Sequence, residues 1–290
     1  MLLILRTMVL ALFLLGVAGC GSSPAPTATP TPPTPTPTPA APTVTPTETA
    51  PQIVESVPSI ITVGIDPAFE PFVFTQEGRL AGFDVDLLNA MAAEADFEVA
   101  YVVSSFGEIF DGLQQGRYDA AISAITVTDA RRALVDFTAP YFESGKASVS
   151  FYNPGQGIAI RTDNMTIIGP ESLIEGMRVG VKSGTTGAEY AEENIGAEIV
   201  AFAESEPALE ALAAGELDAV IVDISVIVGY IRNNPEAGIR ITGGPVNEES
   251  YAIAVSKDKP AVLALLDAAL VKVKESGAYD RIYNLWFGTP

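Results

Sequence analysis

Two stretches of the chain repeat one pattern, and this repeat constrains the fold more than any other feature. The first, LQQGRYDAAI, covers residues 113–122, and the second, LAAGELDAVI, covers residues 212–221. In each copy, apolar residues at helical spacing precede a glycine, and an apolar run follows an Asp-Ala pair. This order predicts a helix, a glycine that ends it, and a short buried strand. Two copies favour two lobes of about a hundred residues each.

Strand and helix patterns alternate around both copies. The other predicted strands are the short β-branched or apolar runs at 61–65, 177–181 and 251–255. The predicted helices have apolar residues at intervals of three and four and cover 83–95, 186–194 and 260–276. This alternation predicts an α/β fold with mainly parallel strands, in which ligands bind at the carboxyl ends of the strands. Ser123 and Thr126 follow one repeat copy and Asp223 follows the other, so facing lobes would present hydroxyls and a carboxylate to a shared cleft.

Residues 1–20 have the layout of a secretory signal peptide. Arg6 precedes an apolar stretch that is too short to span a membrane, and small residues lead to Cys20. The order Val-Ala-Gly-Cys is similar to the lipobox of bacterial lipoproteins, which implies lipidation of Cys20 and attachment to a membrane surface by acyl chains. An ordinary signal peptide with an incidental cysteine is the alternative. A single cysteine excludes a disulfide within the chain.

Residues 21–57 are predicted to form a tether. Between Pro24 and Pro51 the chain is mostly proline and threonine, a composition that favours extended polyproline II and cannot bury a core. At about 3.1 Å per residue this spacer would reach about 85 Å. A glycosylated stalk is an alternative use of the same threonines.

The folded part of the chain is strongly acidic. The net charge is -20, and the first 51 residues contain only Arg6 and Glu48 as charged side chains. This charge disfavours nucleic acid or an anionic membrane as the partner of residues 52–290 and suits solubility outside the cell. The chain has no histidine and one cysteine, which excludes His-based triads and His or Cys zinc sites. No metal or cofactor is therefore expected.

Arg131 stands out because its predicted position does not help the fold. Thr128 is predicted to cap a helix that carries Arg131 and Arg132 in its first turn. A cation there opposes the helix dipole by about 0.3–1 kcal/mol, whereas a bound anion would reverse the sign. The planar guanidinium matches a carboxylate, and Thr126 is close enough in sequence to assist. We expect Arg131 to bind a carboxylate and Arg132 to lie on the surface; a solvated surface role for Arg131 is the alternative.

A second anion-binding feature is the stretch VGVKSGTTGAEY at 179–190. A strand, a small polar loop and a helix start follow one another, and the free N–H groups at such a helix start suit a carboxylate or a phosphate. The spacing is not that of a P-loop, so nucleotide binding is disfavoured. Simple helix capping is the alternative.

Four stretches resemble the family 3 extracellular solute-binding proteins of polar amino-acid ABC importers. They are VGIDPAFEPFVF at 63–74, GRLAGFDVDLLNAMA at 78–92, the run from Ser104 to Phe142, and GAYDRIYNLWF at 277–287. The resemblance implies a two-lobed periplasmic-binding-protein type II fold that closes on an amino acid in the interlobe cleft. It implies lobe 1 at 58–145 plus 246–290, lobe 2 at 146–245, an extracytoplasmic location, and an ABC permease with its ATPase as partners.

The resemblance also implies roles for individual residues. Arg131 would hold the ligand α-carboxylate beside Thr126 and the backbone of Thr186, and Asp223 would bind the α-ammonium. Phe69 and Phe106 would sandwich the aliphatic part of the ligand, as stiff rings do, although core packing is the alternative for any Phe.

Three further residues fall where family members contact the ligand side chain: Asp66, Ser123 and Ala124. At Ala124 only the backbone N–H would be available. Asp66 is alternatively a turn residue before a proline. As a ligand contact, its carboxylate would favour glutamine, arginine or lysine over glutamate. The other functions considered are a periplasmic dehydratase of the cyclohexadienyl type on the same fold and an amino-acid sensing module.

Overall fold

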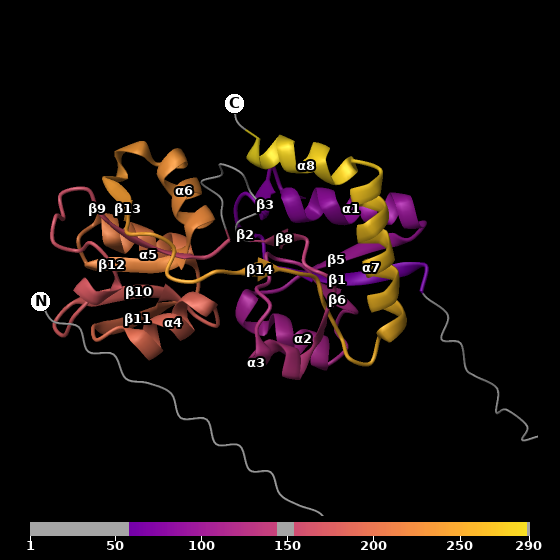
Figure 1. Ribbon diagram of the computed structural model, residues 1–290, viewed down its shortest axis with the longest axis horizontal. Helices are drawn as coiled ribbons and strands as arrows, with labels where there is room; N and C mark the ends of the chain where they lie inside the picture. Colours follow the sequence, from indigo (N-terminus) through magenta and orange to yellow (C-terminus); the bar gives the residue numbers. More distant parts are fainter. Residues whose placement is uncertain (1–57, 144–153, 289–290) are drawn as a thin grey trace, which may run out of the picture. The chain divides into compact units, whose positions relative to one another are not determined.

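The computed structural model describes residues 58–143 and 154–288 (Figure 1). The predicted signal peptide at 1–20, the lipidation site Cys20 and the whole tether at 21–57 lie outside the described residues. Within the two described ranges, no helix combines the length and the apolar character that crossing a membrane requires.

Lobe 1 is built on a five-stranded sheet with the order β5-β1-β6-β15-β7. Its strands are β1 (Ile60–Ile65), β5 (Glu98–Val103), β6 (Ala120–Ala121), β7 (Asp136–Phe137) and β15 (Ala254–Val255). Strand β1 is parallel to β5 and β6, and β15 runs antiparallel to β6 and β7. Beside it lie a small sheet of β2 (Ala68–Phe69), β3 (Val73–Gln76) and β4 (Arg79–Ala81), and a pair made by β8 (Phe142–Glu143) and β14 (Ser250–Tyr251).

Helices cover both faces of the lobe 1 sheet. Three of them pack with β1 in the larger core: α1 (Phe83–Ala95), α7 (Pro260–Glu275) and α8 (Ala278–Phe287). The other face is covered by α2 (Ile109–Gln114), and the short α3 (Asp129–Leu134) lies near α2 in Figure 1. Burial on both faces explains why the strands are apolar runs rather than alternating patterns.

Lobe 2 repeats this arrangement with the strand order β11-β10-β12-β9-β13. Its strands are β9 (Gln156–Arg161), β10 (Arg178–Lys182), β11 (Glu198–Phe202), β12 (Ala219–Asp223) and β13 (Ile239–Thr242), and its helices are α4 (Thr186–Asn194), α5 (Ser205–Ala213) and α6 (Ile224–Asn233). Along β12 the side chains alternate: Ala219 and Ile221 pack toward α4, whereas Val220 and Val222 pack toward α5 and α6. The sheet is therefore buried on both faces.

The internal repeat is confirmed in the register of the sheets. In lobe 1, Ala120 of β6 pairs with Val63 of β1; in lobe 2, Ala219 of β12 pairs with Val179 of β10. The glycine after each preceding helix has a positive φ, 68° at Gly116 and 78° at Gly215, which favours glycine as the helix stop. The two copies thus occupy equivalent places in the two sheets.

Most predicted elements are present, with one informative difference. The predicted strand at 251–255 is divided into β14 and β15, because the chain changes partner along this segment. Tyr251 pairs with Phe142 of β8, whereas Ala254 pairs with Ala121 of β6 and with Phe137 of β7. The predicted helices at 83–95 and 186–194 are found with those bounds, and the helix predicted at 260–276 ends one residue earlier.

Candidate functional site

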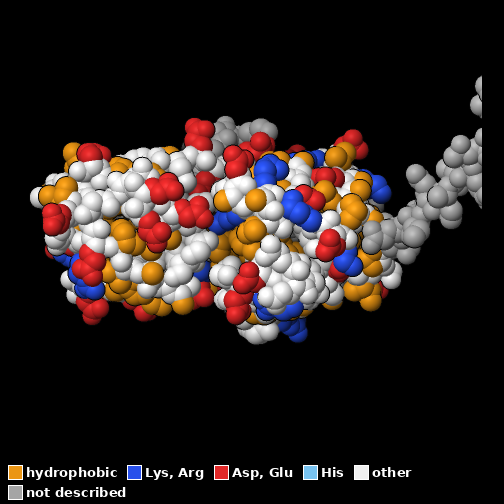
Figure 2. Space-filling model, turned by 90° about the horizontal axis from the view of Figure 1, so that it is seen from below, with side chains coloured by type: hydrophobic (Ala, Val, Ile, Leu, Met, Phe, Trp, Pro, Cys, Tyr) orange, Lys and Arg blue, Asp and Glu red, His pale blue; other side chains and the backbone are white. Residues whose placement is uncertain are grey.

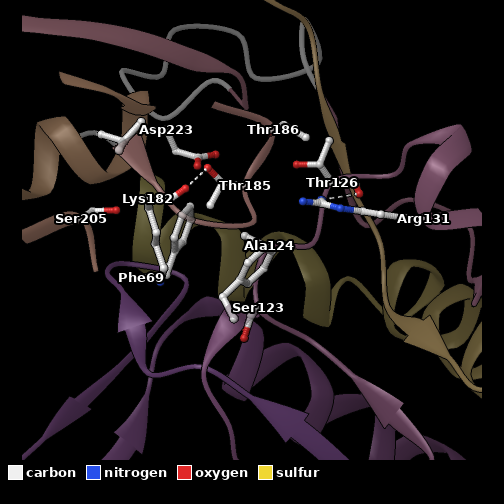
Figure 3. A pocket seen from close by; sticks show the side chains of 12 residues that line it. Phe69, Ser123, Ala124, Thr126, Arg131, Lys182, Thr185, Thr186, Ser205 and Asp223 are labelled. Atoms are coloured by element: carbon white, nitrogen blue, oxygen red, sulfur yellow. Dashed lines mark hydrogen bonds between the residues drawn. The ribbon is translucent and has the colours of Figure 1, made fainter. Parts of the chain in front are cut away.

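A cavity lies where the carboxyl ends of strands from both lobes meet (Figure 3). The side chains and backbone that line it are Phe69, Phe106, Ser123, Ala124, Thr126, Arg131, Lys182, Thr185, Thr186, Ser205, Val222 and Asp223. The whole recess, including its part open to solvent, measures about 380 Å³, but its enclosed space is only about 20 Å³, close to the room that one water needs. The described form is therefore closed too tightly for an amino acid.

Arg131 lies at one end of this cavity, 5% exposed. Its backbone N–H donates to Thr128 Oγ1 at 3.2 Å, as the predicted cap requires, and its guanidinium donates to Thr126 O at 2.9 Å and to Gly184 O at 3.2 Å. The guanidinium also lies 5.4 Å from the Phe106 ring centroid. Burial lowers the pKa of Arg131 below its ordinary value, and nearby carboxylates oppose that shift. Because the hydrogen-bond partners of the Arg131 guanidinium are neutral backbone carbonyls, this buried cation would bind an anion favourably.

Asp223 lies at the end of β12 on the lobe 2 wall, 7% exposed. Its Oδ1 accepts a hydrogen bond of 2.6 Å from the Tyr251 hydroxyl. Burial, and then the charge of Glu249, raise the pKa of Asp223 to about 7. A cation beside this carboxyl would favour its charged form.

Glu249 lies behind the cavity wall and connects the two lobes. It accepts hydrogen bonds from Thr126 Oγ1 at 2.9 Å and Thr186 Oγ1 at 2.5 Å, and from Gln156 Nε2 at 3.3 Å. The Thr126 side chain that sequence reasoning assigned to the ligand is therefore bonded to Glu249 in this form. The Thr186 hydroxyl is bonded to Glu249 as well, whereas the sequence prediction for Thr186 concerned its backbone. Thr186 also begins α4, whose first backbone N–H groups have no carbonyl partner in the preceding turn and can face an anion.

Ser123 and Ala124 form the lobe 1 floor, but their polar groups are occupied by the scaffold. Ser123 Oγ accepts a hydrogen bond of 2.8 Å from the Asp66 backbone N–H. The Ala124 N–H donates to Asp84 at 2.8 Å, and Ala124 has a φ of 45°. The backbone N–H that the sequence prediction reserved for the ligand at Ala124 is thus bonded to Asp84. Burial raises the pKa of Asp84 to about 7.

The two predicted aromatic residues both line the cavity. Phe69 packs on Phe72 of the lobe 1 core with ring centroids 5.7 Å apart and turns its exposed part to the cleft. Phe106 lies beside Arg131 and packs edge-on against Phe110. Each ring therefore combines a packing contact with a place on the cavity wall.

Asp66 lies beside the cavity rather than on its wall, because a lysine separates the two. Lys182 Nζ donates to Asp66 Oδ2 at 2.7 Å across the cleft, and the two side chains are 4% and 5% exposed. A second carboxylate, Glu204 Oε2, lies 2.8 Å from the same nitrogen. Lys182 itself lines the cavity.

Sequence reasoning missed four residues of the cavity: Lys182, Thr185, Ser205 and Val222. The internal repeat contained a signal for the first. Val63-Gly-Ile-Asp66 and Val179-Gly-Val-Lys182 occupy equivalent strands, so Asp66 and Lys182 hold equivalent places in the two lobes. Thr185 is the cap of α4, and Ser205 begins α5, so their place at strand-to-helix turns was a weaker signal.

The surface charge agrees with the composition. Figure 2 shows acidic side chains spread over both halves of the visible face, with basic side chains fewer among them. In the part of the chain that the structure describes, no three His, Cys, Asp or Glu side chains are grouped to hold a metal ion.

Comparison with known proteins gives a consistent result. Residues 61–289 match the family model for bacterial extracellular solute-binding proteins, family 3. A "Probable histidine-binding protein" of Neisseria gonorrhoeae is 34% identical over 233 residues, covering 79% of this chain and 83% of the relative. An L-arginine-binding protein of Pseudomonas aeruginosa is 28% identical over 237 residues, covering 78% and 87%. Among solved structures, an ancestral arginine-binding protein bound to glutamine has a TM-score of 0.73 and 35% identity, covering 81% of this chain and all of that one (100%).

Proposed function

The chain belongs to the family 3 bacterial extracellular solute-binding proteins, and we propose that it captures a polar or basic L-amino acid for an ABC importer. The observation that carries this proposal is the placement of Arg131 and Asp223. They come from different lobes, are both buried, and line one cavity. A guanidinium and a carboxyl at two walls of one cleft complement the two poles of a zwitterion.

Ligand binding and closure are coupled in this arrangement. Arg131 binds the α-carboxylate together with the N-terminus of α4, and Asp223 binds the α-ammonium. Only a closed form satisfies both poles at once, so the ligand shifts the population of open and closed forms by that difference in free energy. An affinity in the micromolar range, about 8 kcal/mol, is within reach of a ligand of ten heavy atoms.

The remaining features complete the proposal. Residues 1–20 act as a signal peptide, lipidated Cys20 anchors the protein, and residues 21–57 form the tether. Lobe 1 comprises 58–145 plus 246–290, and lobe 2 comprises 146–245. The closed form is what the importer's permease and ATPase respond to, on the extracytoplasmic side of the membrane.

We further propose that the chain is a binding protein and not an enzyme of the cyclohexadienyl dehydratase type. Such an enzyme needs an acid poised over a leaving hydroxyl. Asp223 is the buried carboxyl of the cavity, and its Oδ1 already accepts from Tyr251. Turnover of a prephenate-type substrate would contradict this assignment.

The proposal is tested by a thermal-shift screen of the proteinogenic amino acids, because a tight ligand raises the melting temperature of the protein it binds. Arg131→Ala is expected to abolish the shift. Arg132→Ala is the matched control: the neighbouring arginine is exposed and stacks on Phe137 at 5.7 Å, away from the cavity. Binding that survives in Arg131→Ala, or that is lost equally in Arg132→Ala, would refute the clamp.

A further inference from the structure

We infer that Glu249 is a positioning residue of the closed form: it holds the first turn of α4 against lobe 1 and so sets how long any bound amino acid is retained, without choosing among amino acids. This inference rests on the proposed function, because it assumes that the α-carboxylate binds between Arg131 of lobe 1 and the start of α4 in lobe 2.

Glu249 is attached to lobe 1 by its neighbours in the chain. It directly precedes β14, which pairs with β8. Thr126 forms an antiparallel bridge with Tyr251, and the Val127 N–H donates to Ser250 O at 3.0 Å. The hydrogen bond of 2.9 Å from Thr126 Oγ1 to Glu249 therefore lies within lobe 1 and does not depend on closure.

Two other hydrogen bonds of Glu249 cross to lobe 2. Its Oε1 accepts from the hydroxyl of Thr186, the first residue of α4, at 2.5 Å, and from Nε2 of Gln156, the first residue of β9, at 3.3 Å. Asn247 Nδ2 also donates to Oε1, at 2.9 Å, from the connection that precedes Glu249. Glu249 is 6% exposed, and hydrogen bonds to a buried carboxylate are among the strong ones in proteins. Opening of the cleft must break the bond to Thr186, because Thr186 moves with lobe 2.

Glu249 and Arg131 hold the same turn of lobe 2 by hydrogen bonds of opposite polarity. Arg131 donates to Gly184 O at 3.2 Å, whereas Glu249 accepts from Thr186 Oγ1. Thr126 connects the two charged residues, because its carbonyl oxygen accepts from Arg131 at 2.9 Å and its hydroxyl donates to Glu249. Figure 3 shows Arg131, Thr126 and Thr186 together at one end of the cavity.

The two interlobe bonds respond differently to a ligand. An α-carboxylate takes the Arg131 guanidinium and displaces Gly184 O. Glu249 lies behind the cavity wall, and the described residues that line the cavity do not include it. The bond between Glu249 and Thr186 therefore remains in the complex. It keeps the first N–H groups of α4 beside the α-carboxylate, whatever the ligand side chain.

The consequence is a slower release of every ligand. An amino acid that both lobes hold leaves when the cleft reopens, and reopening breaks the bond between Glu249 and Thr186. This bond therefore slows the dissociation of all amino acids by the same factor. It also favours the closed form when no ligand is present.

The first test measures the ligand-free protein. Fluorophores are attached to unnatural residues at one exposed position in each lobe, and single-molecule energy transfer gives the ratio of closed to open molecules. We expect Glu249→Gln to lower this ratio at least about tenfold, because the variant keeps the size of the side chain but removes the charge that strengthens the bond to Thr186. Glu248→Gln is the matched control, since it removes the same charge from the exposed neighbouring residue. Equal ratios in the wild type and in Glu249→Gln would overturn the inference.

The second test measures the dissociation of glutamine and of arginine. Stopped-flow fluorescence follows the reopening of each complex after dilution, with the same fluorophores on the two lobes. Glu249→Gln should accelerate the release of both amino acids at least about tenfold and by the same factor, whereas Glu248→Gln should leave both rates unchanged. Unchanged rates in Glu249→Gln, or acceleration for one amino acid alone, would contradict a role that acts through Thr186.

A double-mutant cycle separates positioning from a general loss of stability. Thr186→Val removes the hydroxyl and keeps the backbone N–H and the shape of the side chain. It should accelerate dissociation from the wild-type protein but add little in the Glu249→Gln background, because both changes act on one hydrogen bond. Additive effects on the dissociation rate would refute the assignment. So would a lower free energy of urea unfolding in Glu249→Gln with dissociation rates like those of the wild type, because Glu249 would then support only the fold.

The two proposals fail in different ways. Should no proteinogenic amino acid shift the melting temperature, the proposed function is wrong, while the ratio of closed to open ligand-free molecules still tests Glu249. Should amino acids bind through Arg131 while Glu249→Gln changes neither this ratio nor the dissociation rates, the proposed function stands and the role of Glu249 is wrong.

Discussion

Ligand binding should release a proton from the buried Asp223 carboxyl at mildly acidic pH. In the ligand-free protein, burial and the charge of Glu249 raise the pKa of Asp223 from 3.8 to about 7, although Arg131 and hydrogen bonds from Tyr251 and Gln156 oppose the shift. An arriving α-ammonium requires the charged carboxylate. Below about pH 7 each binding event must therefore remove a proton from Asp223.

The magnitude follows from the size of the shift. Below about pH 7, each further unit by which the pH falls should weaken the observed affinity about tenfold, or about 1.4 kcal/mol. Above about pH 7, Asp223 is already charged without ligand, so its titration should no longer change the affinity. The same shift has the opposite consequence for the ligand-free fold. The folded chain binds this proton more tightly than the unfolded chain, so its contribution to the free energy of unfolding falls as pH rises from 3.8 to about 7.

The assay is titration calorimetry with glutamine in two buffers of different ionisation enthalpy. The difference in apparent enthalpy counts the protons released. We expect close to one proton per ligand at about pH 6 and none at about pH 8. Asp223→Asn should weaken the binding of free amino acids, remove the proton release, and spare des-amino analogues. Equal enthalpies in both buffers at about pH 6, or proton release that persists in Asp223→Asn, would refute the assigned role of Asp223.

Two further predictions concern the scaffold of the cavity. Asp84→Asn keeps an acceptor for the Ala124 N–H and removes a carboxyl whose pKa is raised by burial from 3.8 to about 7. The variant should therefore gain stability relative to the wild type as the pH rises from 3.8 to about 7. A difference in the free energy of urea unfolding that does not depend on pH would contradict this prediction. Gly112→Ala places a methyl group against the Tyr118 hydroxyl and should destabilise the protein by about 1–3 kcal/mol. Gly107→Ala is the control, because its methyl group meets open space and should change the stability by less than about 0.5 kcal/mol. Equal urea midpoints for the two variants would show that the contact with Tyr118 is relieved without cost.

The repeat made much of the fold predictable, because each copy encodes a local sequence of helix, glycine and strand. Local patterns also located the strand ends, and the nearness of Ser123 and Thr126 to one of them singled out Arg131. The helix-dipole argument for Arg131 is weaker than the sequence suggested, because α3 has six residues and Arg131 also belongs to its last turn. Asp223 was found in a similar way, since it lies two residues after the second repeat copy. The register pairs Val63 with Ala120 and Val179 with Ala219, which is the equivalence that the two copies predict.

Contacts that depend on how the lobes meet were not predictable in the same way. Lys182 and Asp66 are 116 residues apart, and nothing in either local pattern states that their strand ends face each other. Glu249 lies in a connection without periodic apolar residues, so its contact with Thr126 had no local signal. Sequence reasoning therefore assigned Asp66 directly to the ligand, whereas the structure pairs Asp66 with Lys182, which lines the cavity.

The closed form is stabilised by groups that imitate a ligand. Arg131 donates across the cleft to the carbonyl oxygen of Gly184 at 3.2 Å, and Asp66 accepts from Lys182 at 2.7 Å. An amino acid must displace the first contact and make room for itself in an enclosed space of about 20 Å³. Its effect on closure is then the difference between its own contacts and those it replaces, not their sum. Since a carboxylate binds a guanidinium more strongly than a peptide carbonyl does, the exchange at Arg131 favours the ligand.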